Sequence, residues 1–260
     1  MNAIKSDKKY NETYKRIADR FRIMEEFSKA ALTGDVRSSI YSGPAGLGKS
    51  FTVEKLLKDW DPEGVSHIII KGFCTTVGLV RMLYQHRHAG HVIVFDDCDS
   101  MFFDETSMNL LKTICDTCED RVVSYISDYK MVSKEDGELV PERFEFDAAV
   151  IFLTNLDLDA EVAKDRKISP HMAALISRSH YIDLSLKSAD DYLVRIDQVV
   201  EQGMLKHLSN GEKNDVLNFV YANKGILREL SLRMVIKLAG IRKMKPKEWQ
   251  NVAKITCCRS

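Results

Sequence analysis

Strand-length apolar runs alternate with amphipathic stretches of helix length from the start of the chain to about residue 186. The expected strands are 38–42, 67–71, 91–95, 121–126, 149–153 and 181–186. The expected helices in this part are 10–32, 49–60, 77–86 and 105–118. Strands that alternate with helices predict an α/β fold, in which a mostly parallel sheet is covered on both faces.

The pattern changes after residue 186, where strand-like runs stop. Four helices are expected there, 188–204, 212–223, 227–239 and 247–257. We therefore predict an α/β domain over residues 1–186 and a small, all-helical domain over residues 187–260.

One insertion interrupts the α/β pattern. Between residues 127 and 147 side chains alternate in character on either side of Asp136-Gly137, a dipeptide typical of tight turns. We expect a β-hairpin here, directly before the strand 149–153.

Overall composition says little about the fold or the function of the chain, but the distribution of charge along the chain is informative. The chain is 45% hydrophobic and 29% charged, as in ordinary globular proteins, and its 38 basic residues balance its 38 acidic residues. Overall charge therefore argues neither for nor against a nucleic-acid partner. The segment 224–260, however, holds ten basic and two acidic residues, a local charge of +8.

Nothing in the sequence predicts a membrane or a disulfide framework. The N-terminus has no apolar core of signal-peptide length, and no apolar run approaches the roughly 18 residues of a membrane span. We expect a soluble, cytoplasmic protein without membrane contact. Cys115 and Cys118 form a C-x-x-C, but no second pair or histidine follows at zinc-ligand spacing, so we interpret them as two thiols one turn apart on a helix.

The stretch SGPAGLGKS carries the strongest chemical signal. It matches G-x-x-x-x-G-K-[ST], and it lies between an expected strand and an expected helix, as that pattern requires. Its glycines let backbone N–H groups wrap phosphates, Lys49 supplies positive charge, and Ser50 offers a hydroxyl to Mg²⁺. We expect ATP and Mg²⁺ as ligands. The expected nucleotide contacts are Gly43, Pro44, Ala45, Gly46, Leu47, Gly48, Lys49, Ser50 and Phe51.

A second signal is the acidic pair in HVIVFDDCDS, which follows an uninterrupted apolar run. Ligands of open α/β sheets lie at the carboxyl ends of such strands. Asp96 is placed to hold Mg²⁺ together with Ser50, and Asp97 to act as base for the attacking water. The alternative is that both aspartates only cap the next helix.

These motifs, in this order, resemble the AAA+ ATPases over residues 10–239, nearly the whole chain. The resemblance implies a parallel-sheet P-loop NTPase core followed by a helical lid domain. Residue by residue it implies Walker A at Gly43–Ser50, Walker B at Asp96 and Asp97, sensor 1 at Asn155, the arginine finger at Arg178 and sensor 2 at Arg228. A finger that acts in trans implies head-to-tail contacts between copies, and the family suggests a homohexameric ring.

One residue departs from the family pattern, which has Glu where this chain has Asp97. The missing methylene withdraws the carboxylate by something over 1 Å, which can cost on the order of 100-fold in rate. Two interpretations follow, a slow but working ATPase or an ATP-gated switch with little turnover. We favour the ATPase, because Asn155 and Arg178 serve the transition state.

The substrate is less clearly indicated. Phe73, in the loop 71–78, is either a pore residue or part of the core, and the hairpin 127–147 resembles the pre-sensor-1 hairpin of AAA+ helicases and some unfoldases. The basic segment, with Trp249, suggests contact with nucleic acid. We favour a motor that remodels DNA or a DNA–protein complex slightly over one that remodels or unfolds proteins.

Overall fold

The computed structural model describes residues 8–128, 130–133 and 137–259, and the chain divides into two compact units. The first, here called the sheet unit, comprises Arg22–Gly43 and Lys49–Leu184. The second, the helical unit, comprises Met1–Phe21, Pro44–Gly48 and Ser185–Ser260. Among the described residues, no helix is both long enough and apolar enough to cross a membrane.

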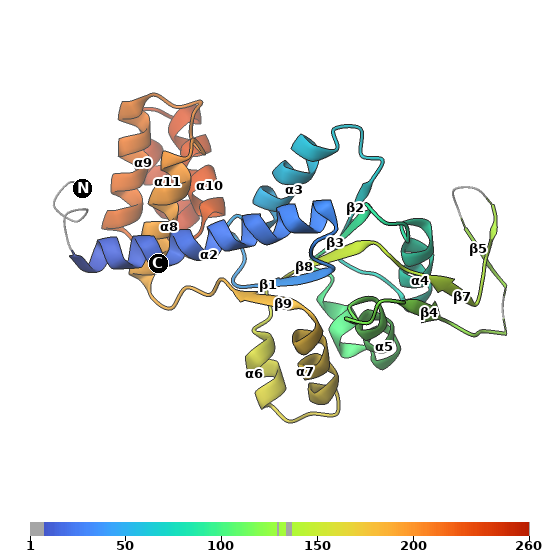
Figure 1. Ribbon diagram of the computed structural model, residues 1–260. Helices are drawn as coiled ribbons and strands as arrows, with labels where there is room; N and C mark the ends of the chain where they lie inside the picture. The colour runs from blue at the N-terminus through green and yellow to red at the C-terminus, as the bar shows by residue number, and fades with distance from the viewer. Residues whose placement is uncertain (1–7, 129, 134–136, 260) are drawn as a thin grey trace. The chain divides into compact units, whose positions relative to one another are not determined.

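The sheet unit is built on five parallel strands in the order β2-β3-β8-β1-β9 (Figure 1). Their bounds are β1 Ser38–Ser42, β2 His67–Lys71, β3 Val92–Asp96, β8 Ala149–Thr154 and β9 His180–Asp183. Every residue of β1, β3 and β8 is buried, as expected for central strands covered on both faces. The predicted α/β fold is confirmed.

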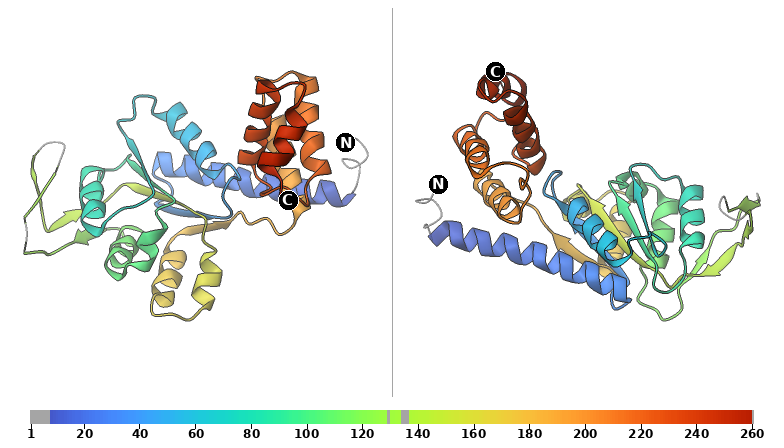
Figure 2. Two further views of the ribbon diagram at one scale, coloured as in Figure 1. Left: turned by 180° about the vertical axis from the view of Figure 1, so that it is seen from behind. Right: turned by 90° about the horizontal axis from the view of Figure 1, so that it is seen from above.

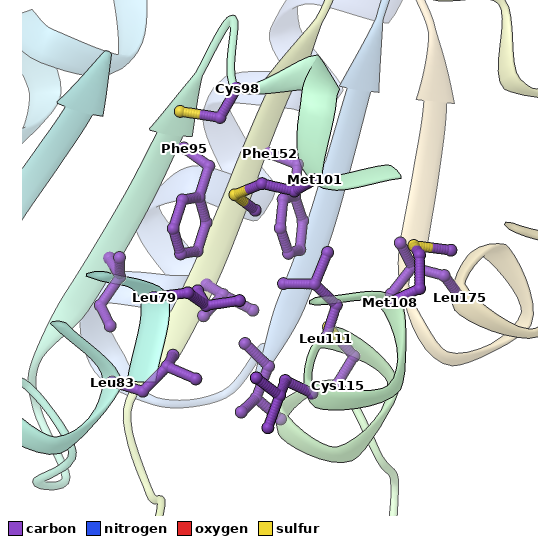
Figure 3. Packing of buried hydrophobic residues seen from close by; sticks show 14 of the residues in the cluster. Leu79, Leu83, Phe95, Cys98, Met101, Met108, Leu111, Cys115, Phe152 and Leu175 are labelled. Atoms are coloured by element: carbon purple, nitrogen blue, oxygen red, sulfur yellow. The ribbon is translucent and has the colours of Figure 1, made fainter. Parts of the chain in front are cut away.

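Helices cover both faces of this sheet. Buried residues of α4 (Thr76–Gln85), α5 (Glu105–Ile114) and α7 (Ser169–Arg178) share one apolar cluster with the sheet. In it, Phe95 of β3 stacks on Phe152 of β8 with ring centroids 5.3 Å apart, beneath α4 and α5 (Figure 3). The buried residues of α3 (Lys49–Trp60) do not belong to this cluster, and α3 lies on the opposite face (Figure 2).

The expected strand 121–126 does not join the main sheet. Instead β4 (Val122–Ser124) pairs antiparallel with β7 (Arg143–Glu145), and β5 (Met131–Val132) pairs antiparallel with β6 (Leu139–Val140). The β5–β6 pair lies within the segment where the hairpin is predicted, and Asp136 of the expected turn lies outside the described residues. These four strands form a ribbon that extends away from the sheet (Figure 1).

Helices around the sheet differ from expectation in two places. The helix expected over 105–118 ends at Ile114, with Cys115 as its C-cap, so the two thiols of the C-x-x-C do not share a helix. Between Asn155 and β9, two unpredicted helices occur, α6 (Leu158–Ala163) and α7. Their start signals are Asp157, whose carboxylate accepts the backbone N–H of Ala160 at 2.9 Å, and a proline in the first turn of α7.

The helical unit contains the first part of the long helix α2 (Lys8–Thr33) and four further helices. These are α8 Ala189–Glu201, α9 Asn210–Ala222, α10 Leu232–Met244 and α11 Trp249–Cys257. The helix expected over 227–239 begins five residues later, because the Ser231 hydroxyl caps it by accepting the Met234 backbone N–H at 3.1 Å.

Trp249 does not have the exposed position that base stacking would require. Its side chain is 5% exposed and packs on Phe219, with ring centroids 5.1 Å apart. The suggestion that Trp249 assists nucleic-acid contact is therefore wrong, and this residue is part of the core of the helical unit.

Candidate nucleotide site

Three polar segments meet at the carboxyl edge of the sheet. In the strand register Ser42 of β1 pairs with Thr154 of β8, and Asp96 of β3 pairs with Leu153 of β8. The residues that directly follow these strand ends therefore lie side by side. Within the sheet unit this edge brings together Lys49, Ser50, Asp96, Asp97 and Asn155.

Lys49 is the buried cation of this edge. Its side chain is 5% exposed, and its ammonium donates to the Asn155 amide oxygen at 3.1 Å and to the Gly43 backbone carbonyl. A buried ammonium group is costly unless its protons are bonded, and these two oxygens satisfy part of its capacity. The amine is thus held between the end of β1, where the phosphate loop begins, and the end of β8.

Ser50 and Asp96 form the part of the edge that fits Mg²⁺. The Ser50 hydroxyl donates to the Asp96 carboxylate at 2.8 Å, and burial raises the pKa of Asp96. Mg²⁺ usually takes one or two protein oxygens and completes its shell with water and phosphate. No cluster of three His, Cys, Asp or Glu side chains suited to a metal occurs in the described part of the chain, and a phosphate-bound Mg²⁺ does not need one.

Asp97 occupies an unusual backbone conformation. Its φ is 55°, in the left-handed region, and its backbone N–H donates to the Leu153 carbonyl at 3.0 Å. Its carboxylate accepts a 2.7 Å hydrogen bond from the side-chain amide of Asn155. Short polar residues such as Asp tolerate this region better than longer ones, which is a physical reason for Asp where the family has Glu.

Asp99 and Thr154 complete the edge, and Thr154 is a residue that the sequence reasoning missed. The Thr154 hydroxyl donates to the Asp99 carboxylate at 2.6 Å, and burial raises the pKa of Asp99. This bond ties the segment that follows β3 to the end of β8, next to the hydrogen bond between Asn155 and Asp97. The sequence does contain a signal for Thr154, because it is the single polar residue that ends the apolar run AVIFLT.

The phosphate loop itself has the conformation that its glycines require. Gly46 has φ 77° and Gly48 has φ 94°, both in the region that strains any other residue. A Cβ on Gly46 would stand 2.8 Å from the Ser231 Cβ, which leaves no room for a side chain. Residues Pro44–Gly48 group with the helical unit, where the Leu232 backbone N–H donates to the Gly46 carbonyl at 2.9 Å.

Arg195 of α8 also contacts this loop, and nothing in the sequence pointed to it. It is 4% exposed, and its Nε donates to the Leu47 carbonyl at 3.2 Å. Its guanidinium carbon lies 3.3 Å from the ring centroid of Phe21. The loop backbone in the helical unit is therefore held by a buried, stacked guanidinium group.

Arg178 lies at the other end of the sheet from Lys49. The Ser38 hydroxyl donates to the Arg178 carbonyl at 3.0 Å, and Ser38 is the first residue of β1, whereas the phosphate loop follows its last. At about 3.3 Å per residue, β1 alone separates the two ends by roughly 13 Å. The Arg178 Nε lies 3.5 Å from the Asp116 carboxylate, so the structure does not bring Arg178 to the site of its own chain.

Two arginines of the helical unit differ in their relation to the loop. Arg228, which the sequence placed in a helix, lies in a bend before α10, where its backbone N–H donates to the Cys257 carbonyl at 2.9 Å. Arg233, which the sequence reasoning missed, is exposed in the first turn of α10, and its Cγ lies 3.7 Å from the position of a Cβ on Gly46. Ser231, as a possible helix N-cap, was the sequence signal that could have placed Arg233 in the first turn of a helix.

Two exposed phenylalanines flank the edge. Phe51, in the first turn of α3, is 70% exposed, and Phe73, in the loop after β2, is 75% exposed. The alternative that Phe73 belongs to the core is wrong. Both side chains are accessible to a ligand or a partner.

No protein-family model matches the chain. The chain is 32% identical over 248 residues to the "Uncharacterized 36.7 kDa protein in nrdC-mobD intergenic region" of Enterobacteria phage T4. The match covers 94% of this chain and 75% of that protein.

Among solved structures, the chain resembles a mutant of RuvB from Thermotoga maritima, with a TM-score of 0.51 and 11% identity, over 93% of this chain and 70% of that one. NtrX from Brucella abortus in complex with ATP gives a TM-score of 0.49 and 13% identity, and this chain spans 53% of its length. Both are AAA+ P-loop ATPases. At 11% identity, the likeness to RuvB shows the fold alone.

Proposed function

The chain belongs to the family of the phage T4 36.7 kDa protein and has the AAA+ fold, and from this premise we propose that it is a Mg²⁺-dependent ATPase that remodels a macromolecular substrate. The observation that carries the proposal is the edge where Lys49, Asp97 and Asn155 are joined by hydrogen bonds. A phosphate-binding amine and a carboxylate that are joined through one amide are the parts that phosphoryl transfer to water requires.

Each side chain of the edge has a role in this proposal. The phosphate loop, with Gly43–Ser50, would bind the ATP phosphates, and Ser50 and Asp96 would hold Mg²⁺, which neutralises charge on the phosphates when bound. Asp97 would accept a proton from the attacking water, and Asn155 would hold both Asp97 and that water in position. Phe51, exposed beside the loop, would contact the nucleotide base or ribose.

Arg178 supports an assembly of several copies. It lies at the amino end of the sheet, so it would complete the site of a neighbouring copy and not its own. Such head-to-tail contacts close into a ring, for which we propose a homohexamer in the cytoplasm. A sensor-2 arginine would come from the helical unit, as Arg228 by resemblance to the family or as Arg233 by its position beside Gly46.

For the substrate we propose DNA or a DNA–protein complex. The basic segment 224–260 supports this, because Lys243 in the last turn of α10 and Lys245 and Lys247 between α10 and α11 are exposed. Protein remodelling without DNA is the second candidate, favoured by the acidic ribbon described below. A gel-shift titration with labelled DNA at increasing salt tests the choice, since phosphate contacts predict a steep loss of affinity with salt.

Steady-state phosphate release tests the enzyme. We expect wild type to release phosphate, Lys49→Ala to lose nucleotide binding, and Asp97→Asn to bind ATP while releasing phosphate on the order of 100-fold more slowly. Equal rates for wild type and Asp97→Asn would contradict hydrolysis at this site and would leave the ATP-gated switch as the better explanation.

A further inference from the structure

The ribbon formed by β4, β5, β6 and β7 carries a charge opposite to that of the basic segment. Residues 122–145, which span these four strands, include six acidic and three basic residues, a local charge of −3. Among the described side chains, four acids are exposed, Asp128, Glu138, Glu142 and Glu145, beside two exposed basic residues, Lys130 and Arg143. Since nucleic-acid phosphates are repelled by such a surface, this ribbon is not built to grip DNA.

The ribbon also exposes large apolar side chains between these acids. Ile126 is 78% exposed, and Leu139 is 55% exposed. Exposed apolar groups with acidic neighbours are features of surfaces that bind polypeptides, where apolar burial supplies affinity and charge supplies selectivity.

A cavity of about 390 Å³ opens where the ribbon meets α4. Its apolar wall comes from Val80, Met131 and Leu139, and its acidic groups are Asp128 and Glu142. Lys130 is a basic group in the same lining. A space of this size accepts one or two side chains, with an apolar stem inside and a cationic head near the carboxylates.

The backbone of the ribbon offers a further means of recognition. In the described residues, β5 pairs only with β6 and lies outside the five-stranded sheet. The outer edge of a two-stranded ribbon can pair with an added extended strand.

We infer that this ribbon binds an extended polypeptide segment rich in basic and apolar residues. The inference rests on the proposed function, of which it names the substrate class: the protein component of the complex that is remodelled. β6 leads into β7, and Ala149 of β8 follows β7 closely, so the ribbon runs directly into the strand that ends beside Asn155. Peptide binding is therefore expected to change the rate of phosphate release as well.

Fluorescence anisotropy with labelled short peptides tests the inference directly. The probes are a peptide of Lys, Leu, Ser and Gly, its counterpart with Glu in place of Lys, and a single-stranded oligonucleotide. The double variant Asp128→Lys/Glu142→Lys reverses two exposed charges of the cavity, and Leu139→Ser removes part of its apolar wall. Glu63→Lys, an exposed acid between α3 and β2, is the matched control.

We expect wild type and Glu63→Lys to bind the basic peptide alike, and the double variant to bind it on the order of tenfold more weakly. Leu139→Ser should weaken it as well, and the acidic peptide should not bind. The inference is overturned if no basic peptide binds at low salt, if the ribbon variants bind as wild type does, or if the oligonucleotide binds in the peptide's place and competes with it.

The binding assay does not depend on hydrolysis, so the two proposals fail separately. Binding without phosphate release would contradict the ATPase and leave the peptide site intact. Phosphate release without binding would retain the ATPase and remove the peptide site. Circular dichroism of each variant confirms that the chain has folded before the result is counted.

Discussion

The amide of Asn155 donates a 2.7 Å hydrogen bond to the carboxylate of Asp97, although the two residues are 58 positions apart in the chain. Asn155 also accepts from Lys49 at 3.1 Å through its amide oxygen. One amide thus orients a base and a phosphate-binding cation together. The orientation of this amide is set by its two neighbours, because its nitrogen can only donate and its oxygen can only accept.

The first prediction concerns this shared amide. Asn155→Ala removes both bonds but leaves the loop glycines in place, so we expect ATP affinity to change little and phosphate release to fall on the order of 100-fold. Asn155→Asp is the matched variant, since it keeps the shape but cannot donate to Asp97. Nucleotide binding by fluorescence and phosphate release measured on the same samples separate the two effects. A fall in affinity that accounts for the whole loss would assign Asn155 to binding alone.

A second prediction addresses the short side chain at position 97. Asp97→Glu restores the residue type of the AAA+ family, but the left-handed backbone there, with φ 55°, disfavours Glu by roughly 1 kcal/mol. The longer side chain would also pass beyond the Asn155 amide. We expect Asp97→Glu to be less stable in urea and no faster than wild type in phosphate release. A faster variant would show that the missing methylene limits the reaction.

Much of the fold could be predicted from periodicity. β1, α3 and β2 have the bounds expected, because each is a run of one period that ends at a turn residue or a motif. The segment 121–126 does contain a strand, β4, but its place outside the main sheet could not be predicted, since an apolar alternating run looks the same in the main sheet and in a ribbon. The pairing of β4 with residues 143–145 depends on tertiary contacts and not on the β-propensity of either segment.

The residues of the candidate site could be predicted where the spacing of a motif identifies them. They could not be predicted where their role depends on which residues lie beside them in the folded chain. Gly48 and Lys49 are identified by spacing alone. The roles of Thr154 and Arg195 depend on which strand ends and helices lie beside them, and a single threonine or arginine has no sequence signature. Arg233 was missed because the start of α10 depends on a serine cap that helical periodicity does not reveal.

The third prediction tests whether Arg178 acts on a neighbouring copy. Arg178→Ala should lose phosphate release on the order of 1,000-fold, and so should Lys49→Ala. Mixed in equal amounts, the two inactive variants should recover roughly a quarter of the wild-type rate, because one interface in four then joins an intact loop to an intact arginine. No recovery in mixtures shown to co-assemble would contradict action in trans.

Asp116→Asn is the control for that experiment. It removes the carboxylate 3.5 Å from Arg178, while the Arg178 guanidinium still donates to the Ala174 carbonyl at 2.9 Å. Both partners are about one-third exposed, so the pair contributes little stability. We expect Asp116→Asn to keep its melting temperature, and a loss of activity as large as that of Arg178→Ala would indicate that the pair is structural.

A fourth prediction separates the two arginines of the helical unit. Because Arg233 lies beside Gly46, Arg233→Ala should reduce ATP affinity or phosphate release on the order of tenfold, as expected for loss of a phosphate-binding charge. Arg228→Ala removes a side chain whose backbone bonds to the end of α11, and we expect nucleotide binding close to wild type. The opposite ranking in a nucleotide titration would assign the sensor-2 role to Arg228.

The last prediction follows from the burial of Asp96. Burial raises its pKa above the ordinary value of 3.8, so between 3.8 and the raised value the folded chain binds more protons than the unfolded chain does. The contribution of Asp96 to the free energy of unfolding therefore falls as pH rises through this window, and at neutral pH the buried charge is destabilising. Hydrolysis has the opposite dependence, because only the ionised carboxylate can hold Mg²⁺.

Asp96→Asn removes that charge while keeping an acceptor for the Ser50 hydroxyl, which donates at 2.8 Å in the wild type. Without nucleotide, we expect this variant to be more stable than wild type at neutral pH, and the difference to shrink as pH falls toward the ordinary carboxyl pKa of 3.8. Phosphate release should be lost at every pH. Urea unfolding at several pH values measures the difference, and a variant less stable than wild type at neutral pH would show that the Asp96 carboxylate stabilises the fold. Gain of stability with loss of activity is the behaviour of a residue kept for its chemistry.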